Sequence, residues 1–365
     1  MPGCSTLEGF FDNSRATHST TALPADGQPL AEPLSRNFFV LASPQDSIVG
    51  ELQLVRINEG DTFSDLAREY GLGYDEIVDA NPTVDPWIPA AGTPVLLPTQ
   101  YVLPDAKRRG IVLNIAAKRL FYYPDAADGE PQTVLTYPIG IGRVGWETPL
   151  GSSTVTAKAR DPHWYVPISV RKEHAAAGDP LPSVVPPGPD NPLGRHVLKL
   201  GMPGYLIHGT NQPYGVGMRV SHGCVRLYPE NIESLYELIA IGEPVAIVNQ
   251  PHLLGRRDDQ LFFESHPVLE DHALDTEQHI AALTKSVSDG GLSPLAPRKL
   301  EARLLAIADN AYGIPTRLRR GKGDEYFEEA LLVRNTVEPD PNAPTLSEVR
   351  EIMDAMPAEE AATAN

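Results

Sequence analysis

The chain has 365 residues, of which 41% are hydrophobic, and its formal net charge is −18 at pH 7. This length predicts two or three domains, and no apolar run in the sequence is long enough to form a transmembrane helix. The acidic balance argues against nucleic acid and against an anionic membrane surface as partners. The 36 prolines favour a loop-rich, mostly β architecture over a helical bundle.

The first 35 residues are expected to form a flexible tether, because residues 5–35 are rich in Ser, Thr, Pro and Ala. The chain contains two cysteines, Cys4 and Cys224, so a disulfide framework does not organise the fold. Gly3-Cys4 resembles the end of a lipoprotein signal, although no basic and apolar segment precedes it. Two alternatives stay open: either Cys4 is lipidated in a longer form, which would be the link to a membrane, or it is an ordinary terminal residue.

A small α+β domain is predicted over residues 51–99. Its expected elements are a strand over 52–57, a helix that Thr62 caps and Gly71 ends, a helix over about 74–80, and a strand over 94–98. A separate strand over 38–41 is expected to dock on a later domain.

This β-α-α-β order resembles a LysM module, with Gly-Asp-Thr after the first strand and Asn-Pro after the second helix. The resemblance implies that the module binds N-acetylglucosamine chains in a shallow groove between those two loops. The residues that it places in the groove are Gly60, Asp61, Thr62, Asn81 and Pro82. The alternative is that they only cap helices and form turns.

Residues 110–250 are predicted to form a mainly β domain. Strands are expected over 111–115, 120–123, 133–139, 153–157, 196–200, 205–207 and 244–248, with one helix that Pro229 opens and Gly242 ends. Short strands separated by Gly- and Pro-rich turns are typical of a β-sandwich or barrel.

The run Ser-His-Gly-Cys at residues 221–224 is the strongest chemical signal in the chain, and Ile-His-Gly-Thr at 207–210 precedes it. The nucleophilic form of a cysteine is the thiolate, and a nearby histidine can generate it by accepting the thiol proton. Glycine lets the backbone bend, so that the amides of Gly223 and Cys224 can face an oxyanion. The alternative is a buried structural cysteine with incidental histidines, which the second His-Gly pair makes less attractive.

The remaining side chains of this region receive roles by position. His208, at a strand end, is the expected general base for Cys224, and His222 is expected to orient the site because a bend at Gly223 turns it away. Ser221 is expected to form a local hydrogen bond.

Substrate contacts are predicted for three further residues. Arg226 could bind a substrate carboxylate bidentately, or it could form a surface ion pair. Tyr205 and Trp164 could line the substrate groove, or they could simply pack against the core.

A zinc site is the second class of interpretation, because His208, His222 and Cys224 are all zinc donors. No Cys-x-x-Cys or His-Glu-x-x-His run supports it. We therefore expect neither a metal nor another cofactor.

The motifs around Cys224, together with Gly140-Ile141-Gly142, Thr148-Pro149-Leu150-Gly151 and the proline-rich run at 185–194, resemble the YkuD-type L,D-transpeptidases. The resemblance covers roughly residues 110–250, and the proline-rich run is similar to the Gram-negative periplasmic branch. It implies cleavage of a peptidoglycan tetrapeptide stem between diaminopimelate and D-alanine through a thioester on Cys224.

The acceptor of the acyl group stays open in this resemblance. A diaminopimelate amine would give a cross-link, the C-terminal lysine of a lipoprotein would give covalent anchoring, and water would make the enzyme an L,D-carboxypeptidase. A non-catalytic wall-binding protein is the remaining alternative, which an intact Cys224 disfavours. The implied partners are stem peptides and glycan chains, and the implied location is the periplasm of a Gram-negative bacterium.

Residues 251–365 are predicted to be a partly helical C-terminal extension. Helices are expected over 301–308 and 347–353, followed by a disordered tail from residue 357. The sequence assigns no function to this extension, which could cover the active site or pack as an appendage.

Overall fold

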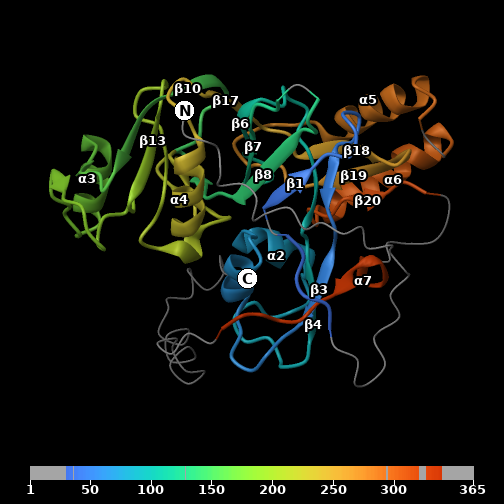
Figure 1. Cartoon of the computed structure of the whole chain (residues 1–365), viewed down its shortest axis with the longest axis horizontal. Coiled ribbons are helices and arrows are strands. Elements are labelled where there is room, and N and C mark those ends of the chain that lie inside the picture. The colour runs from blue at the N-terminus through green and yellow to red at the C-terminus, as the bar shows by residue number, and fades with distance from the viewer. Residues whose placement is uncertain (1–29, 36, 128, 293–294, 320–325, 339–365) are drawn as a thin grey trace.

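The computed structural model describes residues 30–35, 37–127, 129–292, 295–319 and 326–338 (Figure 1). Most of the predicted tether with Cys4, the helix expected over 347–353 and the predicted disordered tail lie outside these residues. Within them, no helix is both long and apolar enough to cross a membrane.

The centre of the molecule is one curled sheet of nine strands, in the order β1-β8-β7-β6-β17-β10-β13-β14-β16. Its strands are β1 (Phe38–Val40), β6 (Gly110–Asn114), β7 (Arg119–Tyr123), β8 (Thr133–Pro138), β10 (Gly151–Arg160), β13 (His196–Leu200), β14 (Leu206–His208), β16 (Val225–Arg226) and β17 (Pro244–Val248). Neighbours are antiparallel except in the pairs β17–β6 and β14–β16, which are parallel. The early strand β1 docks on β8, as predicted.

The sheet and the helix α4 (Pro229–Leu238) enclose a core of aliphatic side chains that includes Leu198, Ile207, Val225 and Leu235. Helix α4 begins at the predicted proline but ends before Gly242. Lys158 explains this end, because its ammonium donates to the carbonyls of Tyr236 and Ile239. The end of the helix is therefore capped from β10.

Three smaller elements lie outside the main sheet. They are the parallel pair β9 (Ile141–Gly142) with β15 (Arg219–Ser221), the antiparallel pair β11 (Trp164–Tyr165) with β12 (Val184–Val185), and the helix α3 (Ile168–Ala176). The sequence analysis predicted no helix over α3. Val170 is the only residue buried within it, so the sequence carries no apolar stripe there.

The predicted small α+β domain is confirmed, with β3 (Gln53–Arg56), α1 (Phe63–Glu69), α2 (Tyr74–Ala80) and β4 (Pro94–Leu97). Thr62 caps α1 as expected, since its side chain accepts from the amide of Asp65 and the Asp65 carboxylate bonds the amide of Thr62. The strand β21 (Leu331–Leu332) of the C-terminal extension pairs with the free edge of β3. The pair β2 (Ile48–Gly50) and β5 (Gln100–Val102) flanks the domain.

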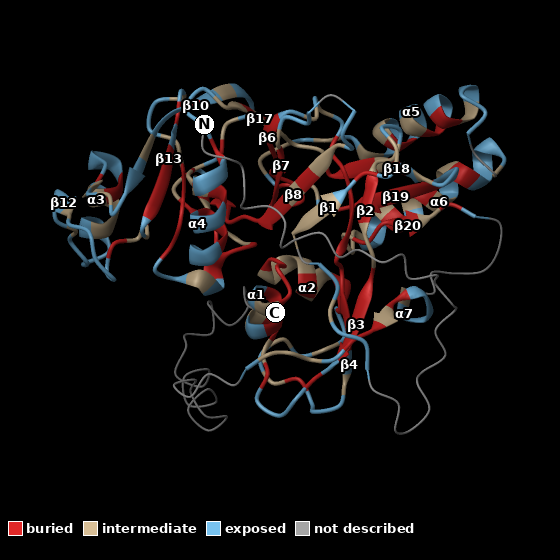
Figure 2. Ribbon diagram, in the orientation of Figure 1, coloured by how far each residue is buried: buried red, intermediate tan, exposed pale blue. Residues whose placement is uncertain are grey.

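The C-terminal extension is a folded unit rather than a purely helical appendage. A three-stranded sheet of β18 (His252–Arg257), β19 (Gln260–Ser265) and β20 (Thr316–Arg317) carries α5 (Thr276–Asp289) and α6 (Pro297–Asn310), and α7 (Tyr326–Glu329) follows. Phe263, Ile280, Leu300 and Leu304 form its core, which appears as buried ribbon in Figure 2. The helix predicted over 301–308 lies within α6.

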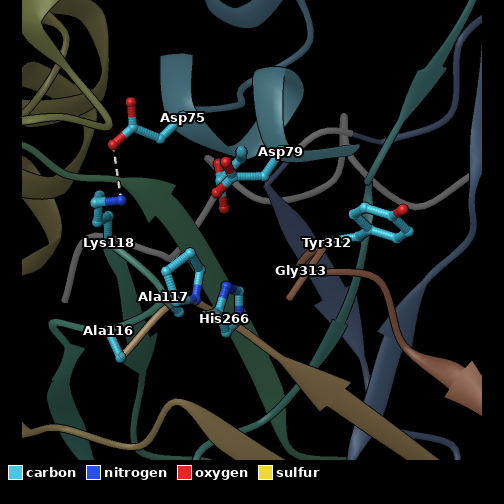
Figure 3. Close-up of a pocket in the computed structure, with 10 residues that line it drawn as sticks. Asp75, Asp79, Ala116, Ala117, Lys118, His266, Tyr312 and Gly313 are labelled. Carbon is cyan, nitrogen blue, oxygen red and sulfur yellow. Dashed lines mark ion pairs between the residues drawn. The ribbon is translucent and has the colours of Figure 1, made fainter. Parts of the chain in front are cut away.

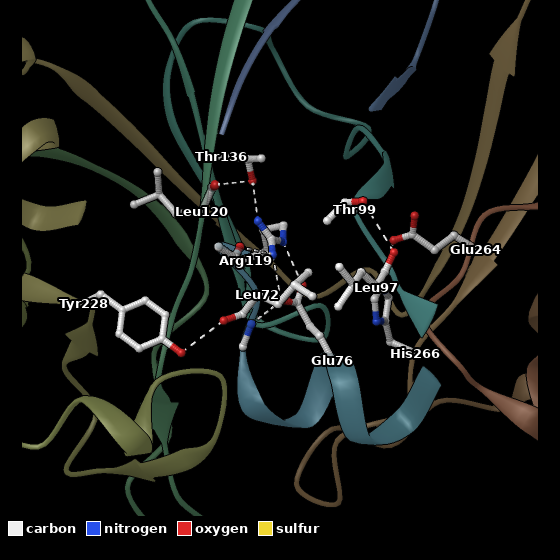
Figure 4. A network of polar contacts seen from close by, with 12 residues as sticks. Leu72, Glu76, Leu97, Thr99, Arg119, Leu120, Thr136, Tyr228, Glu264 and His266 are labelled. Carbon is white, nitrogen blue, oxygen red and sulfur yellow. Dashed lines mark hydrogen bonds and ion pairs between the residues drawn. The ribbon is translucent and has the colours of Figure 1, made fainter. Parts of the chain in front are cut away.

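The small α+β domain is attached to the nine-stranded sheet by a buried ion pair (Figure 4). Arg119, whose side chain is 1% exposed, donates from Nε and Nη2 to the two carboxylate oxygens of Glu76 at 2.7 Å. Arg119 also donates to the carbonyl of Gly71 at 3.0 Å and lies 4.1 Å from the ring centre of Tyr101. A planar guanidinium is suited to such a bidentate contact.

A small cavity lies at the same junction, between α2, the turn before β7 and the C-terminal extension (Figure 3). Lys118 from that turn pairs with Asp75 at 2.7 Å. Burial raises the pKa of the neighbouring Asp79 to about 6, although the charge of Lys118 acts in the opposite direction. Three parts of the chain therefore meet through polar side chains as well as apolar packing.

Arg119→Met would leave the Glu76 carboxylate buried without its partner. We therefore expect the free energy of unfolding to fall by about 3–5 kcal/mol. The matched control is Arg68→Met, because Arg68 forms a bidentate pair with Glu230 across the same domain boundary at an exposed position. That control should lose at most about 1 kcal/mol. Urea denaturation measures both losses, and equal losses would contradict the structural role of the buried pair.

Candidate active site

Two neighbouring strands bring the predicted base and the predicted carboxylate binder together. Strands β14 and β16 are parallel, with Ile207 opposite Val225 and His208 opposite Arg226. Cys224 immediately precedes β16, and side chains alternate along a strand, so Cys224 and Arg226 face the same side as His208. The charge of Arg226 lowers the pKa of both His208 and Cys224, in keeping with this placement on one side of the sheet.

The turn before Cys224 requires glycine. Gly223 has a φ of +97°, a left-handed conformation that residues with side chains rarely adopt. A Cβ atom on Gly223 would lie 3.0 Å from Cε1 of Tyr205 and 3.4 Å from the carbonyl oxygens of Trp146 and Glu147. Tyr205 therefore lies at the site, directly against the turn that carries the cysteine.

Ser221 closes this turn through two hydrogen bonds. Its hydroxyl accepts from the amide of Gly223 at 3.1 Å and donates to the carbonyl of Cys224 at 2.5 Å. The local bonding role predicted for Ser221 matches this geometry. The same contact occupies the Gly223 amide that the sequence analysis assigned to an oxyanion.

His208 is a buried, neutral imidazole. Its Nδ1 lies 2.6 Å from the carbonyl oxygen of Gly209, which can only accept, so Nδ1 carries the proton and Nε2 has a free lone pair. Burial lowers the pKa of His208 to about 3, with a further contribution from the charge of Arg226. The carbonyls of Gly209 and Leu193 act in the opposite direction but do not overcome burial.

Cys224 is a free, half-buried thiol. Its Sγ donates to the carbonyl of Gly204 at 3.6 Å, a weak contact that holds the proton on the sulfur. Burial raises the pKa of the Cys224 thiol, while the backbone of Leu206 and the charge of Arg226 lower it. In the resting site both the thiol and the imidazole are therefore neutral.

Arg226 has a buried Nε with no hydrogen-bond partner among the described residues. No ion pair joins Arg226 to a carboxylate in the same part of the chain. Burial lowers the pKa of the Arg226 guanidinium, and the nearby Cys224 raises it. A half-buried guanidinium in this state is suited to an anionic group that arrives from solution.

His222 points to a different set of partners than Cys224 does. Its Nε2 lies 3.0 Å from the Glu173 carboxylate and 3.1 Å from Nη2 of Arg143, and Glu173 and Arg143 also pair with each other. The ring of Trp146 packs edge-on against it. These contacts fasten the cysteine loop to α3 and fit the orienting role expected for His222.

Several residues that hold this loop were not predicted from the sequence. Thr148 donates from its hydroxyl to the carbonyl of Gly223 at 3.0 Å and accepts from the amide of Gly142 at 3.0 Å. Arg143 and Glu173 were missed because they lie 79 and 49 residues away from His222 in the sequence. Only the motif Thr148-Pro149-Leu150-Gly151 pointed to one of these residues.

Trp164 lies in the short strand β11, which precedes α3. It pairs with Val185 in the two-stranded sheet β11–β12, next in sequence to α3, and its side chain is half-buried. A role for Trp164 in substrate binding stays a prediction.

The predicted glycan-binding residues of the small domain are held largely by internal bonds. Asn81 is buried, and its amide bonds the carbonyls of Ile77 and Leu96 and the amide of Leu96. The side-chain amide of Asn81 is thus committed to the fold. At this loop a sugar would therefore contact the backbone of Asn81 or the neighbouring Pro82.

The loop after β3 is bonded in a similar way. The Asp61 carboxylate accepts from the amide of Asn58 at 2.8 Å and from the side chain of Asn335 at 2.7 Å. Thr62 bonds to Asp65 as the cap of α1. Gly60 has a φ of +91° and open space around the position of a Cβ, so it is the member of this loop with free surface.

In the described part of the chain, no group of three or more His, Cys, Asp or Glu side chains is arranged to hold a metal ion. His208 and Cys224 share one side of the sheet, whereas His222 is bonded to Glu173 and Arg143. The chemistry that this arrangement offers is nucleophilic attack by a thiol with a histidine as the proton acceptor.

The chain thus combines a β domain, with a cysteine and a histidine on one side of its sheet, and a small β-α-α-β domain. The L,D-transpeptidase catalytic domain family, YkuD, matches residues 108–247, and the LysM domain family matches residues 55–98. The probable L,D-transpeptidase YbiS of Escherichia coli K12 is 41% identical over 287 residues, which cover 77% of this chain and 91% of that protein. The chain belongs to the L,D-transpeptidase family.

Two further proteins show the same likeness. The probable L,D-transpeptidase YcfS of Escherichia coli K12 is 36% identical over 297 residues, which cover 80% of this chain and 91% of that protein. Among solved structures, the catalytic domain of an E. faecium L,D-transpeptidase is 21% identical with a TM-score of 0.29, over 40% of this chain and 100% of that one. The sequence relatives, rather than this structural likeness, establish the family.

The raised pKa of Cys224 predicts how the free enzyme reacts with an alkylating reagent. An acid whose pKa lies above the working pH is protonated, so the thiolate fraction should rise about tenfold per pH unit between pH 6 and 8. The rate of iodoacetamide labelling of Cys224, followed by mass spectrometry, measures this slope. A rate that stays constant between pH 6 and 8 would instead indicate a preformed thiolate–imidazolium pair.

Proposed function

We propose that this member of the L,D-transpeptidase family acts on peptidoglycan stem peptides with Cys224 as its nucleophile. The observation that carries the proposal is the pairing of β14 with β16, which sets His208 and Arg226 side by side next to Cys224. A nucleophile, a base and a cation for a substrate carboxylate then lie on one side of one sheet.

The first half-reaction forms a thioester. The Cys224 sulfur attacks the carbonyl carbon between diaminopimelate and the terminal D-alanine, and its proton moves to Nε2 of His208. The tetrahedral intermediate collapses as the carbon–nitrogen bond breaks, and the histidine returns the proton to the leaving amine of D-alanine. The product is a thioester between Cys224 and the tripeptide.

The second half-reaction consumes the thioester. An acceptor amine attacks the same carbonyl carbon, His208 takes a proton from it, and the carbon–sulfur bond breaks to restore the thiol. The resulting amide bond joins the tripeptide to the acceptor. Water in place of the amine would release a free carboxylate, which is the carboxypeptidase alternative.

The neutral resting state fits this sequence of steps. Because burial and Arg226 disfavour an imidazolium at His208, the proton should leave the sulfur as the carbon–sulfur bond forms. The negative charge that develops on the substrate oxygen then compensates the charge on the histidine. The Gly209 carbonyl holds Nδ1 throughout and keeps Nε2 available.

Oxyanion stabilisation is assigned to the backbone at the cysteine turn. Since the Gly223 amide bonds Ser221 in the resting site, the Cys224 amide is the donor that we favour. The Gly223 amide is available to the oxyanion only if the Ser221 hydroxyl, which accepts from it, moves away. Arg226 is assigned to a carboxylate of the stem peptide, and Tyr205 and Trp164 to its side chain.

The LysM domain and the family indicate where the reaction takes place and which acceptors are compatible with it. The LysM domain suits an enzyme that works on glycan-bound stems, with Gly60, Asp61, Thr62, Asn81 and Pro82 as the residues nearest to the sugar. A lipoprotein lysine and a diaminopimelate amine are both compatible acceptors. We place the reaction in the periplasm of a Gram-negative bacterium.

A carbapenem tests the nucleophile directly, because its strained lactam carbonyl acylates an activated thiol with no loss of atoms. We expect intact-protein mass spectrometry to show one added carbapenem mass on the wild type and none on Cys224→Ala. His208→Gln should slow the acylation by about 10²-fold or more, since it removes the base. An adduct on Cys224→Ala, or no adduct on the folded and reduced wild type, would refute the proposed mechanism.

A further inference from the structure

The LysM domain contacts the catalytic domain at the loop that leads into the cysteine motif. The amide of Tyr74, the first residue of α2, donates to the carbonyl of Val216 at 3.0 Å. A Cβ atom on Gly73 would lie 2.6 Å from the Cα of Gly217, and one on Gly217 would lie 2.3 Å from the Cα of Gly73. The two backbones therefore touch through paired glycines, with no room for a side chain on either.

The LysM side of this contact is fixed by further bonds (Figure 4). Arg119 bonds both Gly71 and Glu76, and the Glu76 carboxylate accepts from the amide of Gly73 at 2.5 Å. The hydroxyl of Tyr228 donates to the carbonyl of Leu72 at 3.1 Å. Residues 71–76 are thus held from the catalytic sheet and from the start of α4, so they present a rigid backbone to the loop.

The catalytic side of the contact leads directly to the site. Gly215 precedes Val216, and its carbonyl oxygen lies 2.9 Å from the position of a Cβ on Gly140. The backbone of Gly140 exchanges two hydrogen bonds of 2.9 Å with Arg226, and the amide of Ile141 donates to Met218 at 3.0 Å. A displacement of the loop over 215–218 would therefore move the strand that carries Arg226 and follows Cys224.

We infer that Gly73 and Tyr74 of the LysM domain are positioning residues for the transpeptidase site, because they hold the loop over 215–218 against Gly140, whose backbone is bonded to that of Arg226. The LysM domain is then part of the framework of the site as well as an anchor to the wall. This inference rests on the proposed function of Cys224 and Arg226. It assigns no contact between Gly73 or Tyr74 and the substrate.

Serine is the suitable substitution at Gly73. Gly73 is the N-cap of α2 and has an ordinary φ of −86°, and serine is a favourable residue at that position. Gly73→Ser should therefore keep the helix and add only the Cβ that collides with Gly217. Gly290→Ser in the C-terminal extension is the matched control, because Gly290 also has an ordinary φ and a Cβ there meets nothing closer than 3.4 Å.

Two readouts on the full-length protein test the inference. The pH profile of iodoacetamide labelling of Cys224 should shift to higher pH in Gly73→Ser, because a displaced Arg226 no longer lowers the thiol pKa. Carbapenem acylation should slow by about tenfold to hundredfold, as expected for a misplaced catalytic group. Gly290→Ser should match the wild type in both, and the melting temperature should show that the variants are folded.

Gly217→Ala adds a Cβ to the same contact from the catalytic side and keeps the inference testable if Gly73→Ser does not fold. Because Gly217 has a φ of +90°, alanine there also strains the backbone, so this variant serves to overturn the inference and not to support it. An unchanged labelling profile and acylation rate in a folded Gly73→Ser or Gly217→Ala would overturn the inference, as would equal losses in Gly290→Ser. A wild type that forms no carbapenem adduct would refute the proposed function instead. The labelling profile can still be measured in that case, so the two failures are distinguishable.

Discussion

The buried ion pair between Arg119 and Glu76 is the contact on which the rest of the structure depends. It lies between the catalytic sheet and the LysM domain, and both partners are almost fully withdrawn from solvent. The same guanidinium holds the carbonyl of Gly71, and the same carboxylate holds the amide of Gly73. A buried charge is costly without its partner, so this pair favours one relative placement of the two domains. In that placement the LysM domain packs against the loop that leads into the cysteine motif.

The candidate active site combines this framework with two neutral groups, the proposed base and the proposed nucleophile. Burial disfavours both the imidazolium of His208 and the thiolate of Cys224, so the resting enzyme stores no separated charge between them. Arg226 supplies a permanent charge near both groups. Its position opposite His208 stabilises a thiolate, disfavours an imidazolium and suits the contact proposed with an anionic substrate. The substrate is therefore expected to complete the electrostatics of the site when it binds.

Sequence patterns predicted the local features and missed those that depend on distant contacts. The strands around His208, the cap at Thr62 and the start of α4 at Pro229 follow from residue types and spacing, and the structure confirms them. Helix α3 could not be predicted because it lacks an apolar stripe. The bonds from Glu173 and Arg143 to His222 could not be predicted because they join residues far apart in the sequence. The backbone contact between Gly73 and Gly217 is invisible to sequence alone, since two glycines in loops are compatible with many arrangements.

The thioester on Cys224 is the central claim, and a natural substrate tests it most directly. The full-length protein would be mixed with a tetrapeptide stem that contains diaminopimelate, quenched in acid and mapped by peptide mass spectrometry. We expect the tripeptide acyl group on the peptide that contains Cys224, together with one equivalent of released D-alanine. Release of D-alanine by Cys224→Ala, or an acyl group on any other residue, would contradict the mechanism.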